Sequence, residues 1–178
     1  MGQEIRKHMA EVDGENELSG DVEIDETFIG GVREGKRGPG AAGKSIVLGM
    51  LERGGEIMTK VIPNATRQTI MPLITENVKQ GSTVHTDEFQ TYKSLAKEGY
   101  EHEEVKHHAK EYVKGESHVN GLENYWKLLK SSIASTQVHV SQKHMEKYAK
   151  EFEFRYNNRK NPLRMFPKLV TSFSKQKP

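Results

Sequence analysis

The segment from Val22 to Gly31 constrains the fold of this chain more than any other, because it joins a strand pattern to a central acid. Its valine, isoleucines, threonine and phenylalanine favour a pleated, half-buried strand, whereas Asp25 is a residue type depleted in strands. A residue that opposes its local propensity often marks a functional site. The alternative is a solvent-facing acid on an edge strand, so Asp25 needs support from elsewhere in the chain.

The composition indicates one polar domain without a membrane span or a disulfide framework. The chain has 178 residues, of which 34% are hydrophobic and 29% charged, and it has no cysteine. No apolar run approaches the roughly 20 residues that span a bilayer, and no secretion signal is evident. A cytoplasmic setting is therefore expected.

The small net charge of +2 conceals an asymmetry between the two parts of the chain. Residues 1–105 contain 12 Lys and Arg against 19 Asp and Glu, whereas residues 106–178 contain 15 against 6. A basic segment is expected of a surface that binds phosphates. Its alternative is a solvated helical face, so the asymmetry favours a polyanionic partner without proving one.

The order of strand and helix patterns after residue 20 is β-β-β-α-β-α-β-α-α. Val22–Ile29, Ser45–Glu52 and Glu56–Ile62 predict an antiparallel meander whose second turn contains Gly54 and Gly55. The later expected elements are a helix at 66–78, a strand at 82–86, a short helix at 92–98, a strand at 100–107 and two long helices. The first long helix has an apolar stripe at Leu122, Trp126, Leu129 and Ile133, and the second begins after Ser141. This layout predicts an α/β fold, a mixed sheet with helices packed on it.

One motif points to a different function. Residues 38–45 match the phosphate-loop pattern G-x-x-x-x-G-K-[ST]. That motif works between an apolar strand and a helix, where backbone N–H groups hold phosphates. Here a charged segment precedes the motif and the strand pattern of Ser45–Glu52 follows it, so a nucleotide hydrolase is disfavoured.

Three acids lie where this layout can bring them together. Asp25 is within the first strand, Asp87 follows the fourth, and Glu123 is in the first turn of the first long helix. Two divalent ions about 3.5–4 Å apart can drive phosphodiester chemistry, and Mg²⁺ prefers oxygen ligands. Clustered carboxylates without cations would disfavour one another's ionisation. The three acids therefore predict a metal site.

Each acid also has a simpler explanation. Asp87 could cap the turn that follows it, and Glu123 could form a helix capping box with Asn120. Four histidines could serve as metal ligands, although scattered histidines are more often surface residues: His85, His107, His108 and His118.

Four ordered blocks resemble the ISXO-like DDE insertion-sequence transposases. The blocks are Val-Glu-Ile-Asp25-Glu-Thr-Phe-Ile-Gly-Gly, His-Thr-Asp87-Glu-Phe-Gln-Thr-Tyr, His118-Val-Asn-Gly-Leu-Glu123-Asn-Tyr-Trp-Lys-Leu-Leu-Lys130 and Phe152-Glu-Phe-Arg-Tyr-Asn-Asn-Arg159-Lys. Together they extend from about Gly20 to Leu163. Four blocks in order are more specific than a single acid would be.

The resemblance implies an RNase H-like fold with five strands, three antiparallel and then two parallel, and helices on both faces. It implies a DDE catalytic domain at 21–163. Residues 1–20, which are polar and show no convincing period, are expected to form a linker or frayed lead-in, and residues 164–178 a loosely packed tail. Asp25, Asp87 and Glu123 become the catalytic acids and the ligands of two Mg²⁺ or Mn²⁺ ions, with Asp25 contacting both ions.

The resemblance further implies DNA partners, namely transposon ends and target, and a dimer or higher assembly on DNA at the nucleoid. Lys130, seven residues after Glu123, and Lys127 are the expected DNA contacts on the helix, with Arg33, Lys36 and Arg37 in the preceding basic loop. The cysteine-free chain resembles the catalytic domain alone, without the amino-terminal zinc-ribbon or helix-turn-helix segment of such transposases. Two alternatives are a stand-alone RNase H-like nuclease and an inactive nucleic-acid-binding remnant.

Overall fold

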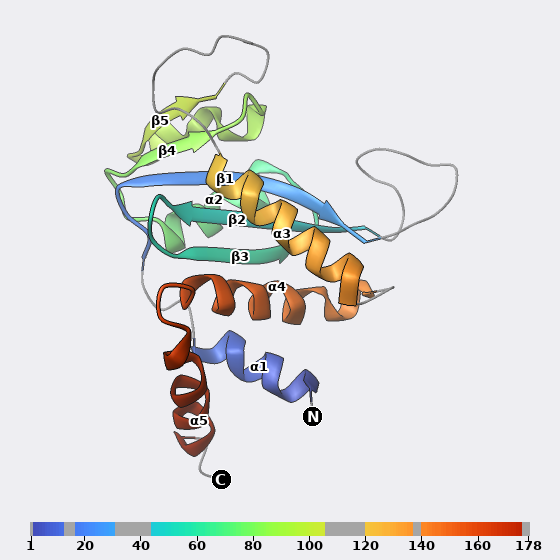
Figure 1. Ribbon diagram of the computed structural model, residues 1–178. Helices are drawn as coiled ribbons and strands as arrows, with labels where there is room; N and C mark the ends of the chain where they lie inside the picture. The colour runs from blue at the N-terminus through green and yellow to red at the C-terminus, as the bar shows by residue number, and fades with distance from the viewer. Residues whose placement is uncertain (1, 13–16, 31–43, 106–119, 137–139, 176–178) are drawn as a thin grey trace, which may run out of the picture.

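A five-stranded sheet forms the centre of the protein (Figure 1). The computed structural model describes residues 2–12, 17–30, 44–105, 120–136 and 140–175. The strands are β1 (Asp21–Ile29), β2 (Ser45–Glu52), β3 (Ile57–Ile62), β4 (Thr83–Thr86) and β5 (Glu101–Glu104). Their order across the sheet is β3-β2-β1-β4-β5, which makes β1 the central strand.

The pairing of β1 with its two neighbours confirms the predicted mixed sheet. β1 runs antiparallel to β2, which runs antiparallel to β3, and the short link between β2 and β3 is the predicted glycine turn. On its other side β1 pairs in parallel with β4, and β4 pairs in parallel with β5. The meander therefore supplies one half of the sheet, and the parallel strands supply the other.

Helices cover both faces of the sheet, as predicted. One core joins Val22 and Ile24 of β1 to α2 (Arg67–Asn77) and to the 3-10 helix η1 (Gln90–Glu98). The other core joins alternate residues of the sheet to α3 (Asn120–Thr136) and α4 (Gln142–Asn157). Figure 1 shows α3 crossing one face of the sheet with α2 behind it. The predicted stripe of α3 is confirmed, because Leu122, Trp126 and Leu129 are buried and Ile133 packs against them.

One helix differs in type from its prediction. The segment after Asp87 forms a 3-10 helix rather than an α-helix, and Gly99 ends it in the left-handed conformation at φ 90°. Pro72 lies in the interior of α2, beyond the first turn, which leaves a kink as the predicted alternative for this proline.

Helix α4 closes the edge of the sheet along β3. Glu153 Oε2 accepts hydrogen bonds from the backbone N–H and the hydroxyl of Thr59, both at 2.6 Å. Asn157 accepts from the N–H of Ile57 at 2.8 Å and donates to its carbonyl at 3.0 Å. Lys150 donates to Glu153 at 2.6 Å and compensates its buried charge. An edge strand that would otherwise offer unpaired groups to another chain is thereby satisfied internally.

The chain ends contain helices where a linker and a tail were expected. Helix α1 (Gly2–Val12) packs against α4 and α5 (Met165–Lys175), and the 3-10 helix η2 (Pro162–Arg164) leads into α5. The His8 and Phe173 ring centroids are 3.6 Å apart. The segment expected to be a linker or frayed lead-in thus contains the helix α1, which packs against two other helices. Phe166 remains 74% exposed, so α5 buries little of its apolar face.

Within the described residues, no helix is both long enough and apolar enough to cross a membrane.

Replacing Glu153 with alanine is expected to lower the free energy of unfolding by about 3–5 kcal/mol, because it leaves the Lys150 ammonium buried without its carboxylate. It also removes the acceptor for two groups of Thr59. Urea denaturation measures the loss. Glu146→Ala, at an exposed position of the same helix, is the control and should change stability by less than about 0.5 kcal/mol. Equal effects of the two variants would contradict the edge-closing role.

Candidate active site

Alternation along β1 separates its acids between the two faces of the sheet. Glu23 and Asp25 contact α3 on one face of the sheet. Glu26 lies near the Tyr92 side chain of η1 on the other face. Successive residues of a strand point to opposite faces, so adjacent Asp25 and Glu26 cannot serve the same site. Of this adjacent pair, Asp25 is the acid that faces α3.

The sheet brings Asp25 and Asp87 to neighbouring strands. In the parallel pairing, Val22 lies opposite Val84 and Glu23 lies opposite His85. Continued by two residues beyond the paired segment, this register leads to Asp25 and to Asp87, which lies one residue past the end of β4. Burial raises the pKa of Glu26, and the charges of Asp25 and Asp87 each add to that rise, so each aspartate lies within electrostatic reach of Glu26. The topology thus directs the first two predicted acids toward the same part of the sheet.

Asp87 has the capping role that the sequence allowed. Its Oδ1 accepts a hydrogen bond from the N–H of Phe89 at 3.0 Å. This Asx-type turn fixes the aspartate at the tip of β4. Because a carboxylate oxygen has two lone pairs, the cap leaves capacity for a further ligand.

The first turn of α3, which contains Glu123, is anchored to β1 through Glu23. The Glu23 side chain is buried, and it accepts hydrogen bonds from the N–H of Leu122 at 2.9 Å and from Arg53 at 3.2 Å. A carboxylate at a helix N-terminus satisfies an unpaired N–H and complements the helix dipole. Gly121 permits this approach, because a Cβ there would lie 2.9 Å from Glu23 Oε2 and 2.6 Å from Leu51.

A second contact joins α3 to Asp25 itself. The indole Nε1 of Trp126 donates a hydrogen bond to Asp25 Oδ2 at 2.9 Å. Trp126 is three residues after Glu123, and residues at this spacing share a helix face. The half-buried Glu123 is thus one helical turn from the residue that contacts Asp25.

Sequence reasoning missed Glu23 and Glu26, although strand alternation signals both. Burial raises the pKa of Glu26 to about 7; the Tyr92 hydroxyl opposes this rise, and the charges of Asp25 and Asp87 add to it. Near neutral pH this side chain is therefore partly protonated.

His85, considered as a metal ligand, is instead held between two acids. Its Nε2 lies 2.8 Å from Asp21 Oδ1 and its Nδ1 lies 3.2 Å from Glu103 Oε2. The hydrogen bond from His85 lowers the pKa of Asp21. The side chain is buried, and its contacts with Asp21 and Glu103 join β1, β4 and β5.

The predicted DNA contacts are only partly within the described residues. Lys127 and Lys130 are exposed on α3, four and seven residues after Glu123. The loop that contains Arg33, Lys36 and Arg37 lies outside the described residues. The two exposed lysines therefore lie about one and two helical turns after Glu123 along α3.

The donor set suits a hard divalent cation, although the side chains are not gathered around one. In the part of the chain that the structure describes, no three His, Asp or Glu side chains form a ready metal-binding group. Asp25, Asp87 and Glu123 offer only carboxylate oxygens, which Mg²⁺ and Mn²⁺ prefer. Mutual repulsion of such acids is relieved when a cation binds.

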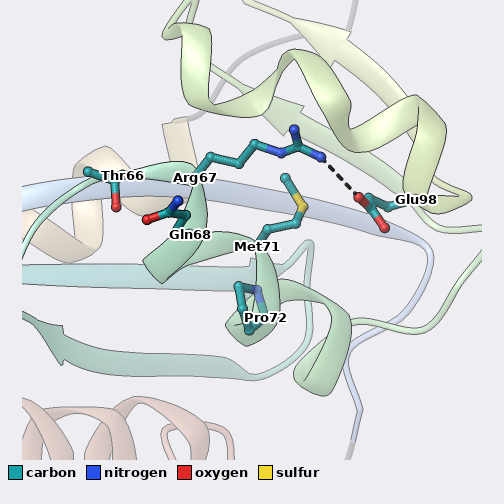
Figure 2. A pocket seen from close by; sticks show the side chains of 6 residues that line it. All are labelled: Thr66, Arg67, Gln68, Met71, Pro72 and Glu98. Carbon is teal, nitrogen blue, oxygen red and sulfur yellow. Dashed lines mark hydrogen bonds and ion pairs between the residues drawn. The ribbon is translucent and has the colours of Figure 1, made fainter.

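A surface pocket on the other side of the sheet lies apart from these acids (Figure 2). It has a volume of about 630 Å³, and residues of α2 and η1 line it. The exposed pair Arg67 and Glu98 bridges its two sides at 3.3 Å. Because its only ionisable groups already pair with each other, the pocket does not mark a catalytic site.

The family model of the ISXO2-like transposase domain matches residues 17–157. The chain belongs to this transposase family. An uncharacterized transposase-like protein of Haemophilus influenzae is 32% identical over 103 residues, which cover 58% of this chain and 82% of that protein. An uncharacterized protein in the transposable element ISH50 of Halobacterium salinarum is 30% identical over 155 residues, which cover 78% of this chain and 52% of that protein.

The fold of this ISXO2-like chain is RNase H-like, as its mixed sheet and its structural likeness agree. The crystal structure of the catalytic domain of Mos1 mariner transposase superposes with a TM-score of 0.52 at 12% identity. The superposition covers 96% of this chain and 93% of that domain. The predicted family and fold are both confirmed.

Gly121→Ala tests whether close approach at Glu23 sets the position of α3. Helix propensity alone predicts that alanine stabilises by up to about 1 kcal/mol. The short contacts with Leu51 and Glu23 predict instead a loss of about 1–3 kcal/mol. The sign of the change in the free energy of unfolding, measured by urea denaturation, distinguishes these two expectations. Ser131→Ala, at an exposed position of α3, is the control and should be neutral or slightly stabilising.

Proposed function

We propose that this chain is a DDE catalytic domain that cleaves DNA at insertion-sequence ends and transfers the cut strand to a target. The observation that supports the proposal is the parallel pairing of β1 with β4, whose register leads toward Asp25 and Asp87, together with the hydrogen bond from Trp126 of α3 to Asp25. The membership of the chain in the ISXO2-like transposase family supports this proposal.

In this proposal Asp25, Asp87 and Glu123 hold Mg²⁺ or Mn²⁺, two ions per site. When bound, such ions activate the attacking hydroxyl and stabilise the leaving oxygen of a phosphodiester. The protein's own part is to orient the ligands. The Asx turn fixes Asp87, and the α3 anchor fixes the helix turn from which Glu123 extends.

DNA is the partner that the exposed cations favour. Lys127 and Lys130 continue the helix face that begins at Glu123, so a phosphate backbone near the acids would meet both ammonium groups. Arg33, Lys36 and Arg37 are proposed as further backbone contacts. Assembly as a dimer or higher oligomer on paired DNA ends is part of the same proposal.

Asp25→Asn, Asp87→Asn and Glu123→Gln are each expected to reduce nicking and strand joining about 1,000-fold or more, because metal ligation contributes several kcal/mol to such a transition state. The assay uses the protein, Mn²⁺ or Mg²⁺, and DNA containing the ends of its element. Glu88→Gln, at an exposed acid next to Asp87, is the matched control and should keep full activity.

Products separate this proposal from its alternatives. Nicked DNA without joined strands would indicate a stand-alone nuclease. DNA binding by the unaltered protein without metal-dependent cleavage would indicate a binding remnant, and the proposal would then be wrong.

Lys130→Ala and Lys127→Ala are each expected to weaken DNA binding and to reduce the slope of log affinity against log salt by about 1, because each removes one phosphate contact. Fluorescence anisotropy over a salt series measures the slope. Lys143→Ala, at an exposed position of α4, removes the same charge as the other two variants and should leave the slope unaltered. Equal slopes for all three variants would contradict a DNA role for α3.

A further inference from the structure

Trp126 makes a contact that its place in the apolar stripe of α3 does not explain. The side chain is 5% exposed, and a buried indole N–H normally needs a hydrogen-bond acceptor. The acceptor is the carboxylate of Asp25, on a different element, at 2.9 Å. The N–H therefore adds a directional contact to the packing of the ring.

The sheet is shaped to admit this indole. Gly49 of β2 lies directly opposite Asp25 in the antiparallel pairing. A Cβ at Gly49 would lie 2.6 Å and 2.7 Å from the Cζ2 and Cη2 atoms of the Trp126 ring. Glycine in a strand interior lowers stability and often marks a close approach. Here it leaves the space through which the ring reaches Asp25.

The spacing between the Trp126–Asp25 and Leu122–Glu23 hydrogen bonds is similar on the helix and on the strand. Glu23 and Asp25 are two residues apart on β1, which is about 6.6 Å. Their partners Leu122 and Trp126 are four residues apart on α3, which is about 6.0 Å. The two hydrogen bonds therefore fix both the position and the rotation of the helix over the strand.

We infer that Trp126, in the space left by Gly49, is a positioning residue that orients the Asp25 carboxylate for divalent-metal binding. This inference rests on the proposed function. The hydrogen bond uses one lone pair of Oδ2 and restricts rotation of the carboxylate. Partners that orient a ligating group typically account for a 10–100-fold difference in metal affinity.

The test measures Mn²⁺ binding directly, by electron paramagnetic resonance of the free ion, in the unaltered protein and two Trp126 variants. One variant is Trp126→Phe, and the other has β-(3-benzothienyl)alanine at position 126, which keeps the bicyclic shape and lacks the N–H. Both are expected to bind Mn²⁺ 10–100-fold more weakly. Tyr125→Phe is the control, because the buried Tyr125 hydroxyl has no hydrogen-bond partner within the described structure. The Mn²⁺ affinity of this variant should stay within about twofold of that of the unaltered protein.

A second readout uses the fact that Trp126 is the single tryptophan of the chain. Mn²⁺ bound at Asp25 is expected to quench tryptophan fluorescence saturably in the unaltered protein, with the same midpoint as in the resonance titration. Asp25→Asn should abolish that saturable phase.

The outcomes separate the inference from the function on which it rests. If the unaltered protein binds Mn²⁺ and Asp25→Asn does not, but both Trp126 variants bind as tightly as the unaltered protein, the positioning role is wrong and the metal site stands. If only the phenylalanine variant is weakened, ring shape rather than the N–H is responsible, and the inference is again overturned. No binding to the unaltered protein would overturn the proposed metal site itself.

Discussion

The seating of α3 on β1 is the contact on which the rest of the candidate site depends. Two side chains of the central strand, Glu23 and Asp25, accept hydrogen bonds from successive turns of the helix. The strand and helix repeats match within about 1 Å over this distance, so both bonds form without distortion. Glycines at 49 and 121 allow the backbones to approach closely enough.

The same match of repeats recurs where α4 meets β3. Glu153 and Asn157, four residues apart, bind Thr59 and Ile57, two residues apart, with the helix running in the opposite direction. At β3 this match closes the edge of the sheet, and at β1 it places α3 over Asp25. Polar contacts thus set how both helices lie on a sheet whose apolar residues drive their burial.

Much of this fold could be predicted because its signals are local. The β2–β3 turn contains two glycines, the α3 stripe repeats at helical spacing, and both patterns formed the expected elements. Helix α1 was missed, because the polar composition of its segment gives no sign of the contacts that it makes with α4 and α5. Glu23 was also missed, since strand alternation indicates which face it occupies but not which N–H it will bind.

The sequence by itself determined which acids are available and which elements contain them: Asp25 in a strand, Asp87 at a strand end and Glu123 in a helix turn. Only the tertiary structure decided their neighbours. The parallel register pairs Glu23 of β1 with His85 of β4, two residues before Asp25 and Asp87, and Trp126 contacts Asp25 across a gap of 101 residues in the chain. The physical reason is that side-chain periodicity is fixed by each residue's own backbone, whereas register and helix seating depend on which distant surfaces pack together.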